Sequence, residues 1–349
     1  MIGINKYIDL TNNYNLIPVY DEIIIDTETP VTLYQKLSRE NDYSFLLESA
    51  RHKDSDKGRY SFIGLYPELV LKKIKDKVYR KDNNGFRKIS NVDFIDYIKS
   101  YLYKIKAYEI EDLPPFSGGF VGYFSYDMIQ NWEDIYHNQP DCSLQRSENP
   151  SSLQVMAKLI LAFDHLKNTV KIIYNIHLQD NFTESEKKRL YFRAKKKISN
   201  VIKQIRNRHN HESMKREYSN CKNLDNKIKS NTDREEYKKM VEIGKKHIRN
   251  GDIFQLVLSQ KFSIETDQSP FQIYRALRVS NPSPYMFFLN FPEIKLIGSS
   301  PEILIKVNNR KVITRPLAGT RPRGETRKDE LIYKNELLNN EKEKAEHIM

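Results

Sequence analysis

The chain has 349 residues, of which 39% are hydrophobic and 30% charged, a balance that excludes a disordered or membrane-embedded protein. Its 58 lysines and arginines against 46 aspartates and glutamates give a formal net charge of +12, which raises the question of an anionic partner. No apolar run approaches the roughly 20 residues that span a bilayer, and the first residues lack the apolar segment of a signal peptide. We therefore expect a cytoplasmic protein that binds no membrane.

The first half of the chain alternates strand patterns with helical ones. Helices are expected at 33–41 and at 92–106, where apolar residues recur at helical spacing. Strands are expected at 43–50, 59–67, 68–82 and 118–129, with a turn at 82–85, and a long hairpin at 155–178 that turns at 164–168. This order predicts an α+β fold, in which mixed antiparallel sheets form a sheet-rich core flanked by helices.

A basic helix and a polar connection follow. The helix is expected at 184–207, and its candidate buried positions are Leu190, Phe192, Ile198 and Ile202. Residues 207–231 are polar and poor in apolar anchors, so we expect a mobile connection between an N-terminal region, 1–206, and a second region, 232–349.

The second region begins with a helix. Thr232, Asp233 and Glu235 have the spacing of a capping box, and Gly251 is placed to end this helix. A strand is expected at 253–266. A helix at 271–281, strands at 285–291, 294–300 and 302–316, and a final helix at 328–349 complete the pattern.

The positive charge is concentrated between residues 186 and 230. Few aromatic residues are interleaved there, and no nucleic-acid-reading motif appears, so we expect no nucleic-acid partner. The two cysteines, Cys142 and Cys221, are too few and too isolated for a disulfide framework or a metal site, and reduced thiols are expected.

Four segments of the second region place polar groups among strand and helix patterns. Gln255 would share a strand face with Ile253 and Val257, and Glu302 follows a proline at a strand start. The turn at 314–324 contains two prolines and two glycines. Glu343 and Glu346 would share a helix face, where two carboxylates suit Mg²⁺. Each feature also has an ordinary structural explanation: backbone hydrogen bonding, an exposed carboxylate, a structural loop, a solvated face.

Taken together and in this order, the motifs of both regions resemble those of a known enzyme family. GDIFQLVLSQ, NPSPYMFF, IGSSPEIL, TRPLAGTRPRG and EKAEHIM follow LLESA, RYSFIG and SGGFVGYFSYD. The chain thus resembles the chorismate-utilising enzymes, and most closely anthranilate synthase component I. The resemblance implies conversion of chorismate and ammonia to anthranilate and pyruvate.

The resemblance also implies site residues. Glu302 would be the general acid, with its pKa raised by burial. Glu343 and Glu346 would line a Mg²⁺ site. The residues expected to contact the substrate are Gln255, Ala318, Gly319 and Thr320.

Two positions imply which product is made. Relatives that add water have a lysine base where this chain has Gln255, and glutamine cannot deprotonate water. The aminodeoxychorismate-forming relatives have a lysine nucleophile where this chain has Ala318. Anthranilate is therefore the expected product.

Regulation and partners are implied as well. LLES and NPSPYMF would form a pocket for the inhibitor L-tryptophan, and the residues expected to line it are Leu47, Glu48, Ser49, Asn281, Pro284, Tyr285 and Met286. The alternative is that Leu46 and Leu47 are plain core and that Pro-Ser-Pro is a turn. A glutamine amidotransferase subunit, component II, would supply the ammonia in a heterotetramer.

The family pattern continues beyond E-x-x-E-H-x-M to a catalytic histidine and a second metal-binding glutamate. We therefore expect the 349-residue chain alone to be inactive. It would be either a fragment of a working enzyme or a natural truncation, and in the second case a non-catalytic remnant that binds tryptophan or the partner subunit. A basic binding module is the third hypothesis.

Overall fold

The computed structural model describes residues 2–38, 43–49, 58–82, 85–90, 92–133, 149–207 and 227–349. The chain forms two compact units. One unit consists of Met1–His209 and Pro270–Met349, and the other of Asn210–Ser269. Of the connection predicted at 207–231, residues 208–226 lie outside the described residues, and the predicted region boundaries stay predictions.

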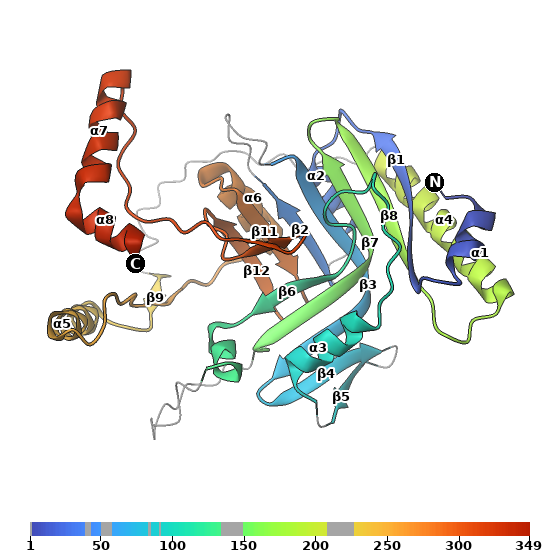
Figure 1. The fold of residues 1–349 in the computed structure, drawn as a ribbon, viewed down its shortest axis with the longest axis horizontal. Coiled ribbons are helices and arrows are strands. Elements are labelled where there is room, and N and C mark those ends of the chain that lie inside the picture. The colour runs from blue at the N-terminus through green and yellow to red at the C-terminus, as the bar shows by residue number, and fades with distance from the viewer. Residues whose placement is uncertain are drawn as a thin grey trace. The chain divides into compact units, whose positions relative to one another are not determined.

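An antiparallel sheet forms the centre of the first unit (Figure 1). Its main path runs in the order β1 (Leu16–Ile24), β8 (Thr169–His177), β7 (Ser152–Asp164), β3 (Tyr60–Ile74), β2 (Ser44–Glu48), β11 (Tyr285–Asn290) and β12 (Lys295–Ser300). Three further strands branch from it, namely β4 (Lys77–Asp82), β5 (Gly85–Ile89) and β6 (Phe120–Phe124). Strands from both ends of the chain therefore share one sheet, and the predicted α+β class is confirmed.

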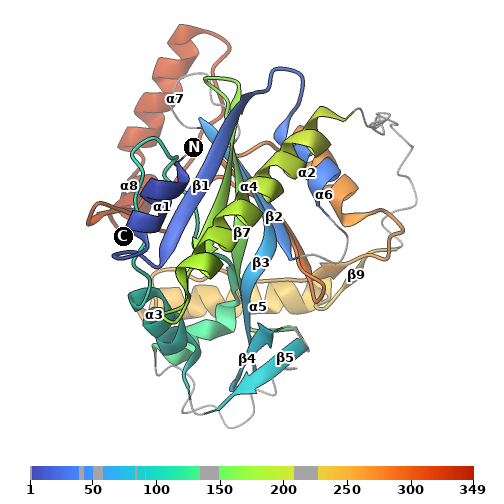
Figure 2. The same ribbon diagram turned by 90° about the vertical axis from the view of Figure 1, so that its right-hand side faces the viewer.

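Helices cover one face of this sheet, called here the helix face. It carries α1 (Ile4–Leu10), α2 (Pro30–Leu37), α4 (Glu184–Arg206) and α6 (Pro270–Ser280). Figure 2 looks onto this face, with α4 running across the strands. Strand residues alternate between two cores, as the pleat requires: Leu46 packs under the helices, whereas Phe45 packs on the opposite face. A third cluster lies under α3 (Phe94–Tyr103).

Helix α4 confirms the predicted helix and three of its four predicted inward positions, because Leu190 and Ile202 are half-buried against the core beside the buried Ile198. Thr183 and Glu186 form a capping box at its N-terminus. Ile198 is buried as predicted, but Phe192 is 59% exposed, so that prediction is wrong. The positions that face the sheet are Tyr191, Ala194, Ile198, Val201 and Ile205. Phe192 does not fit the three- and four-residue spacing of these positions, so it faces solvent.

The second unit contains α5 (Arg234–Asn250) between β9 (Lys229–Ser230) and β10 (Phe262–Ser263). Asp233, one residue later than the capping pattern suggests, caps the helix, and Gly251 ends it with a positive φ of 81°, as predicted. The strand predicted at 253–266 is wrong except at β10. Residues 253–260 meet no pairing strand in the described part of the chain, and a strand needs a ladder partner.

The C-terminal segment contains a hairpin of β13 (Lys306–Asn308) and β14 (Lys311–Ile313), then α7 (Arg327–Asn339) and α8 (Glu341–Ile348). The single strand predicted at 302–316 is thus two, joined through Asn309 and Arg310 with positive φ. The final helix is also divided, because Asn340 caps α8 with its side chain, which accepts from the Glu343 N–H. None of the described helices has a stretch long and apolar enough to cross a membrane.

Candidate active and inhibitor sites

The loop at 314–324 joins Glu302 to helix α8. The Leu317 N–H donates to Glu302 Oε1 at 2.9 Å, and Arg321 Nη1 donates to Glu343 Oε1 at 3.0 Å. A Cβ on Gly319 would lie 1.4 Å from Glu343 Oε2, so any larger residue there would displace the Glu343 carboxylate. The structure therefore brings together Glu302, the Ala318–Thr320 turn and Glu343, here called the loop cluster.

Burial in the loop cluster is uneven. The Glu343 side chain is 16% exposed, and Arg321 beside it is 25% exposed. Glu302 is an exposed residue, so the burial expected of a general acid is not found. Its carboxylate is covered by the loop on one side, through the Leu317 N–H, and its neighbour Leu304 is 89% exposed.

The metal expectation rests on two carboxylates of α8. Glu343 and Glu346 are one helical turn apart and half-buried. Among the residues that the structure describes, no three His, Cys, Asp or Glu side chains come together as a metal-ligand group. Carboxylate oxygens with retained water are nevertheless a donor set that Mg²⁺ accepts. Arg321 occupies Glu343 Oε1, so a bound cation would compete with this ion pair.

Gln255 lies in the second unit and outside any strand. It is exposed, and Val257, which was expected to share its strand face, is 83% exposed. The prediction of a half-buried strand position is therefore wrong, for the reason given for the whole segment: no partner strand in the described chain pairs with it.

The LLES and NPSPYMFF motifs meet in the sheet of the first unit. Strands β2 and β11 are antiparallel neighbours, with Met286 opposite Glu48 and Phe287 opposite Leu47. Directly opposed residues share a face, so Glu48 and Met286 lie on the helix face and Leu47 lies on the other. The structure therefore unites two of the predicted inhibitor residues and separates Leu47 from them.

Glu48 is only 7% exposed, and α6 supplies its partners. The Tyr274 hydroxyl donates to Glu48 Oε2 at 2.5 Å, and Arg278 Nε donates to the same oxygen at 3.0 Å. Burial and the adjacent Glu48 carboxylate raise the pKa of Tyr274 far above its usual range. Sequence reasoning missed both partners, although a tyrosine and an arginine one helical turn apart within an apolar pattern signal a buried polar contact.

The other predicted inhibitor residues lie at the ends of β2, α6 and β11. Ser49 follows β2 and is half-buried, and Asn281 follows α6, where its carbonyl accepts from Ser299 Oγ. Pro284 precedes β11 and is half-buried, whereas Tyr285 is 41% exposed.

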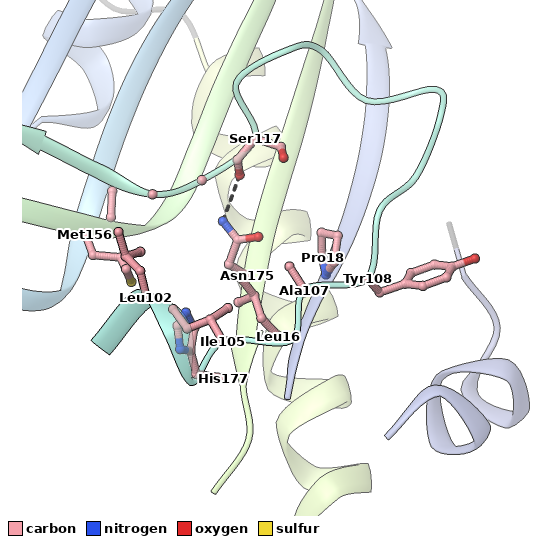
Figure 3. Close-up of a pocket in the computed structure, with 13 residues that line it drawn as sticks. Leu16, Pro18, Leu102, Ile105, Ala107, Tyr108, Ser117, Met156, Asn175 and His177 are labelled. Atoms are coloured by element: carbon pink, nitrogen blue, oxygen red, sulfur yellow. Dashed lines mark hydrogen bonds between the residues drawn. The ribbon is translucent and has the colours of Figure 1, made fainter. Parts of the chain in front are cut away.

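A cavity of about 180 Å³ lies elsewhere in the first unit, beside β1 and β8 (Figure 3). Asn175 Nδ2 donates to the Ser117 carbonyl across one side of it, at 2.9 Å. Its lining includes His177, whose pKa is lowered by burial, with Glu68 opposing and Lys158 reinforcing the shift. None of the predicted site residues lines this cavity.

The sequence model of the chorismate binding enzyme family matches residues 42–349, so the chain belongs to this family. It is similar to anthranilate synthase component 1 of Acetivibrio thermocellus, at 38% identity over 97% of this chain and 67% of that protein. The corresponding protein of Aquifex aeolicus is 36% identical over 97% of this chain and 66% of its own length. These relatives confirm the family resemblance of the motifs.

A solved structure agrees with this assignment. The crystal structure of anthranilate synthase component I from Streptococcus pneumoniae matches with a TM-score of 0.65 at 29% identity, over 94% of this chain and 66% of that one. The chain thus spans about two thirds of the length of the relatives it matches.

Proposed function

We propose that the chain provides the chorismate-converting part of an anthranilate synthase. Chorismate and ammonia would become anthranilate, pyruvate and water. The observation that carries this proposal is the loop cluster: in a member of the chorismate binding family, it links Glu302, the Ala318–Thr320 turn and Glu343 through direct contacts.

The proposed chemistry assigns a role to each part of the loop cluster. Ammonia adds at ring carbon 2 while the 4-hydroxyl leaves, and Glu302 donates the proton with which it departs as water. The Leu317 N–H holds this carboxyl in place. Pyruvate is then eliminated, which leaves the aromatic ring. The Thr320 hydroxyl and the backbone N–H groups of the turn would bind substrate oxygens.

Mg²⁺ is the proposed cofactor. Glu343 and Glu346 would hold it, and it would supply positive charge to a substrate carboxylate. The ion would compete with Arg321 for Glu343 Oε1, and an Arg321 displaced in this way could pair with a substrate carboxylate instead.

Ammonia is proposed as the nucleophile because neither Gln255 nor Ala318 has a group that would support the alternatives. The amide of Gln255 cannot take a proton from water, which disfavours a hydroxylated product. The methyl group of Ala318 cannot attack the ring, which disfavours a covalent route. Ammonia, delivered by a glutamine amidotransferase subunit in a heterotetramer, is the nucleophile that remains.

Regulation by L-tryptophan is the second part of the proposal. The residues that support it are Glu48 and Met286, which the strand pairing brings together on the helix face. Ser49 and Pro284, both half-buried, lie beside them in the chain.

The activity is testable in a chimaera that adds the part of the Acetivibrio thermocellus relative that this chain does not span. With chorismate, ammonia and Mg²⁺ it should form fluorescent anthranilate. Glu302→Gln keeps the size of the side chain but removes the proton donor, so turnover should fall by about 10²–10⁴. Glu325→Gln, an exposed glutamate on the same segment, is the matched control.

Near-normal turnover of Glu302→Gln would show that Glu302 is not the general acid. Isochorismate or aminodeoxychorismate as the product would overturn the proposed reaction. A chimaera that binds tryptophan but converts no chorismate would support the alternative of a non-catalytic binding protein.

A further inference from the structure

Glu48 is a carboxylate placed where a charge is costly. Its side chain is 5% exposed on the helix face, between the apolar residues Leu46 and Met286. A buried carboxylate has to be paired and hydrogen-bonded, or it loses its charge. The chain meets this requirement with two donors from α6.

Both hydrogen bonds that stabilise the buried charge of Glu48 are made to the same carboxylate oxygen. Tyr274 and Arg278 both donate to Oε2, at 2.5 and 3.0 Å. No donor from the described parts of the chain hydrogen-bonds to Oε1. The carboxylate is therefore held at one end and has acceptor capacity left at the other.

The two donors differ in burial. Tyr274 is 0% exposed, and its ring stacks on Phe271 and packs against Phe288. Its hydroxyl position is thus fixed by the aromatic core under α6. Arg278 lies one helical turn further on, with a side chain that is 40% exposed, so its charge reaches from solvent to the buried carboxylate.

We propose that Tyr274 and Arg278 are positioning residues for recognition of an amino-acid ligand: they hold Oε2 of Glu48 so that Oε1 accepts the ligand's ammonium group. This inference rests on the proposed regulation by tryptophan. It adds that α6, a helix outside both sequence motifs, determines whether the site distinguishes an amino acid from an analogue without the ammonium.

The test compares two ligands on the 349-residue chain by calorimetry. L-Tryptophan carries the ammonium group and indole-3-propionate lacks it. In Arg278→Ala the affinity for tryptophan should fall by roughly tenfold or more, as expected for a weakened hydrogen bond to a charged group. The affinity for indole-3-propionate should be the same as in the parent chain.

Three further variants separate positioning from folding. Arg278→Lys should recover part of the preference for tryptophan, because it restores the positive charge. Tyr274→Phe removes a single hydroxyl from a fully buried ring and should lower the preference less than Arg278→Ala. Arg275→Ala, on the same helix but hydrogen-bonded to Gln272, should bind both ligands like the parent. Melting temperatures identify any variant that has simply unfolded.

The outcomes distinguish the two proposals. If the parent chain binds no tryptophan, the proposed regulation fails and this inference fails with it. If the parent binds tryptophan and Arg278→Ala and Tyr274→Phe retain its full preference for the ammonium-bearing ligand, only the positioning role fails. An equal loss of both ligands in a folded Arg278→Ala variant would also overturn the positioning role.

Discussion

Two stretches with the same strand pattern have opposite outcomes in this protein. Within the strand predicted at 43–50, Ser44–Glu48 form β2, which is paired with β3 on one side and β11 on the other, and Phe45 and Leu46 are 0% exposed. Residues 253–260 are not a strand, and Phe254 is 90% exposed. Alternating apolar residues therefore show that a segment can become a strand, and the presence of partners decides whether it does.

The largest expected effect contrasts one residue from each stretch. Leu46→Ala removes a fully buried side chain and should lower the free energy of unfolding by about 2–5 kcal/mol. Val257→Ala, at an 83% exposed position, should change it by less than about 0.5 kcal/mol. Urea titrations followed by circular dichroism measure both. Comparable losses would show that 253–260 is packed in solution.

The same contrast explains what the sequence could predict. Local patterns located β2, the β7–β8 hairpin and α4, because periodicity and turn residues are adjacent along the chain. The pattern did not predict α1 or β1, and it did not anticipate the helix break at Asn340, where one side chain competes with a continuous helix.

The candidate sites show the same limit. The resemblance located the motifs, and the structure joins Glu302 to the 314–324 loop through the Leu317 N–H, whereas the roles expected of these residues stay predictions. Tyr274 and Glu48 form a hydrogen bond although they are 226 residues apart in the sequence. Local periodicity cannot predict such a contact. Leu47 and Glu48, adjacent in one motif, lie on opposite faces because a strand alternates.

A smaller effect compares two helices that begin in the same way. Thr183 starts α4 and Thr326 starts α7, each with a capping box. Thr183→Ala should cost about 1 kcal/mol of unfolding free energy, because α4 packs on the sheet and unfolds with it. Thr326→Ala should leave the global value unchanged, because α7 buries no residue and can open alone.

Hydrogen exchange with urea titration measures this second comparison. In Thr326→Ala the α7 amides should exchange faster while the sheet amides do not. Equal losses of global stability in the two variants would show that α7 is packed as firmly as α4.

The smallest effect is a pH dependence expected from His177, a half-buried residue that lines the cavity beside β8. Burial lowers the pKa of His177 below its ordinary value of 6.5, so the unfolded chain binds the proton more readily than the folded one. The stabilising contribution of the neutral ring is complete above pH 6.5 and declines as the pH falls from 6.5 toward the folded-state pKa, by at most about 1.4 kcal/mol per pH unit. His177→Gln should therefore flatten the loss of stability between these values. Urea titrations at a series of pH values give the slopes, and an unchanged slope in His177→Gln would show that the cavity beside β8 already admits the charged ring.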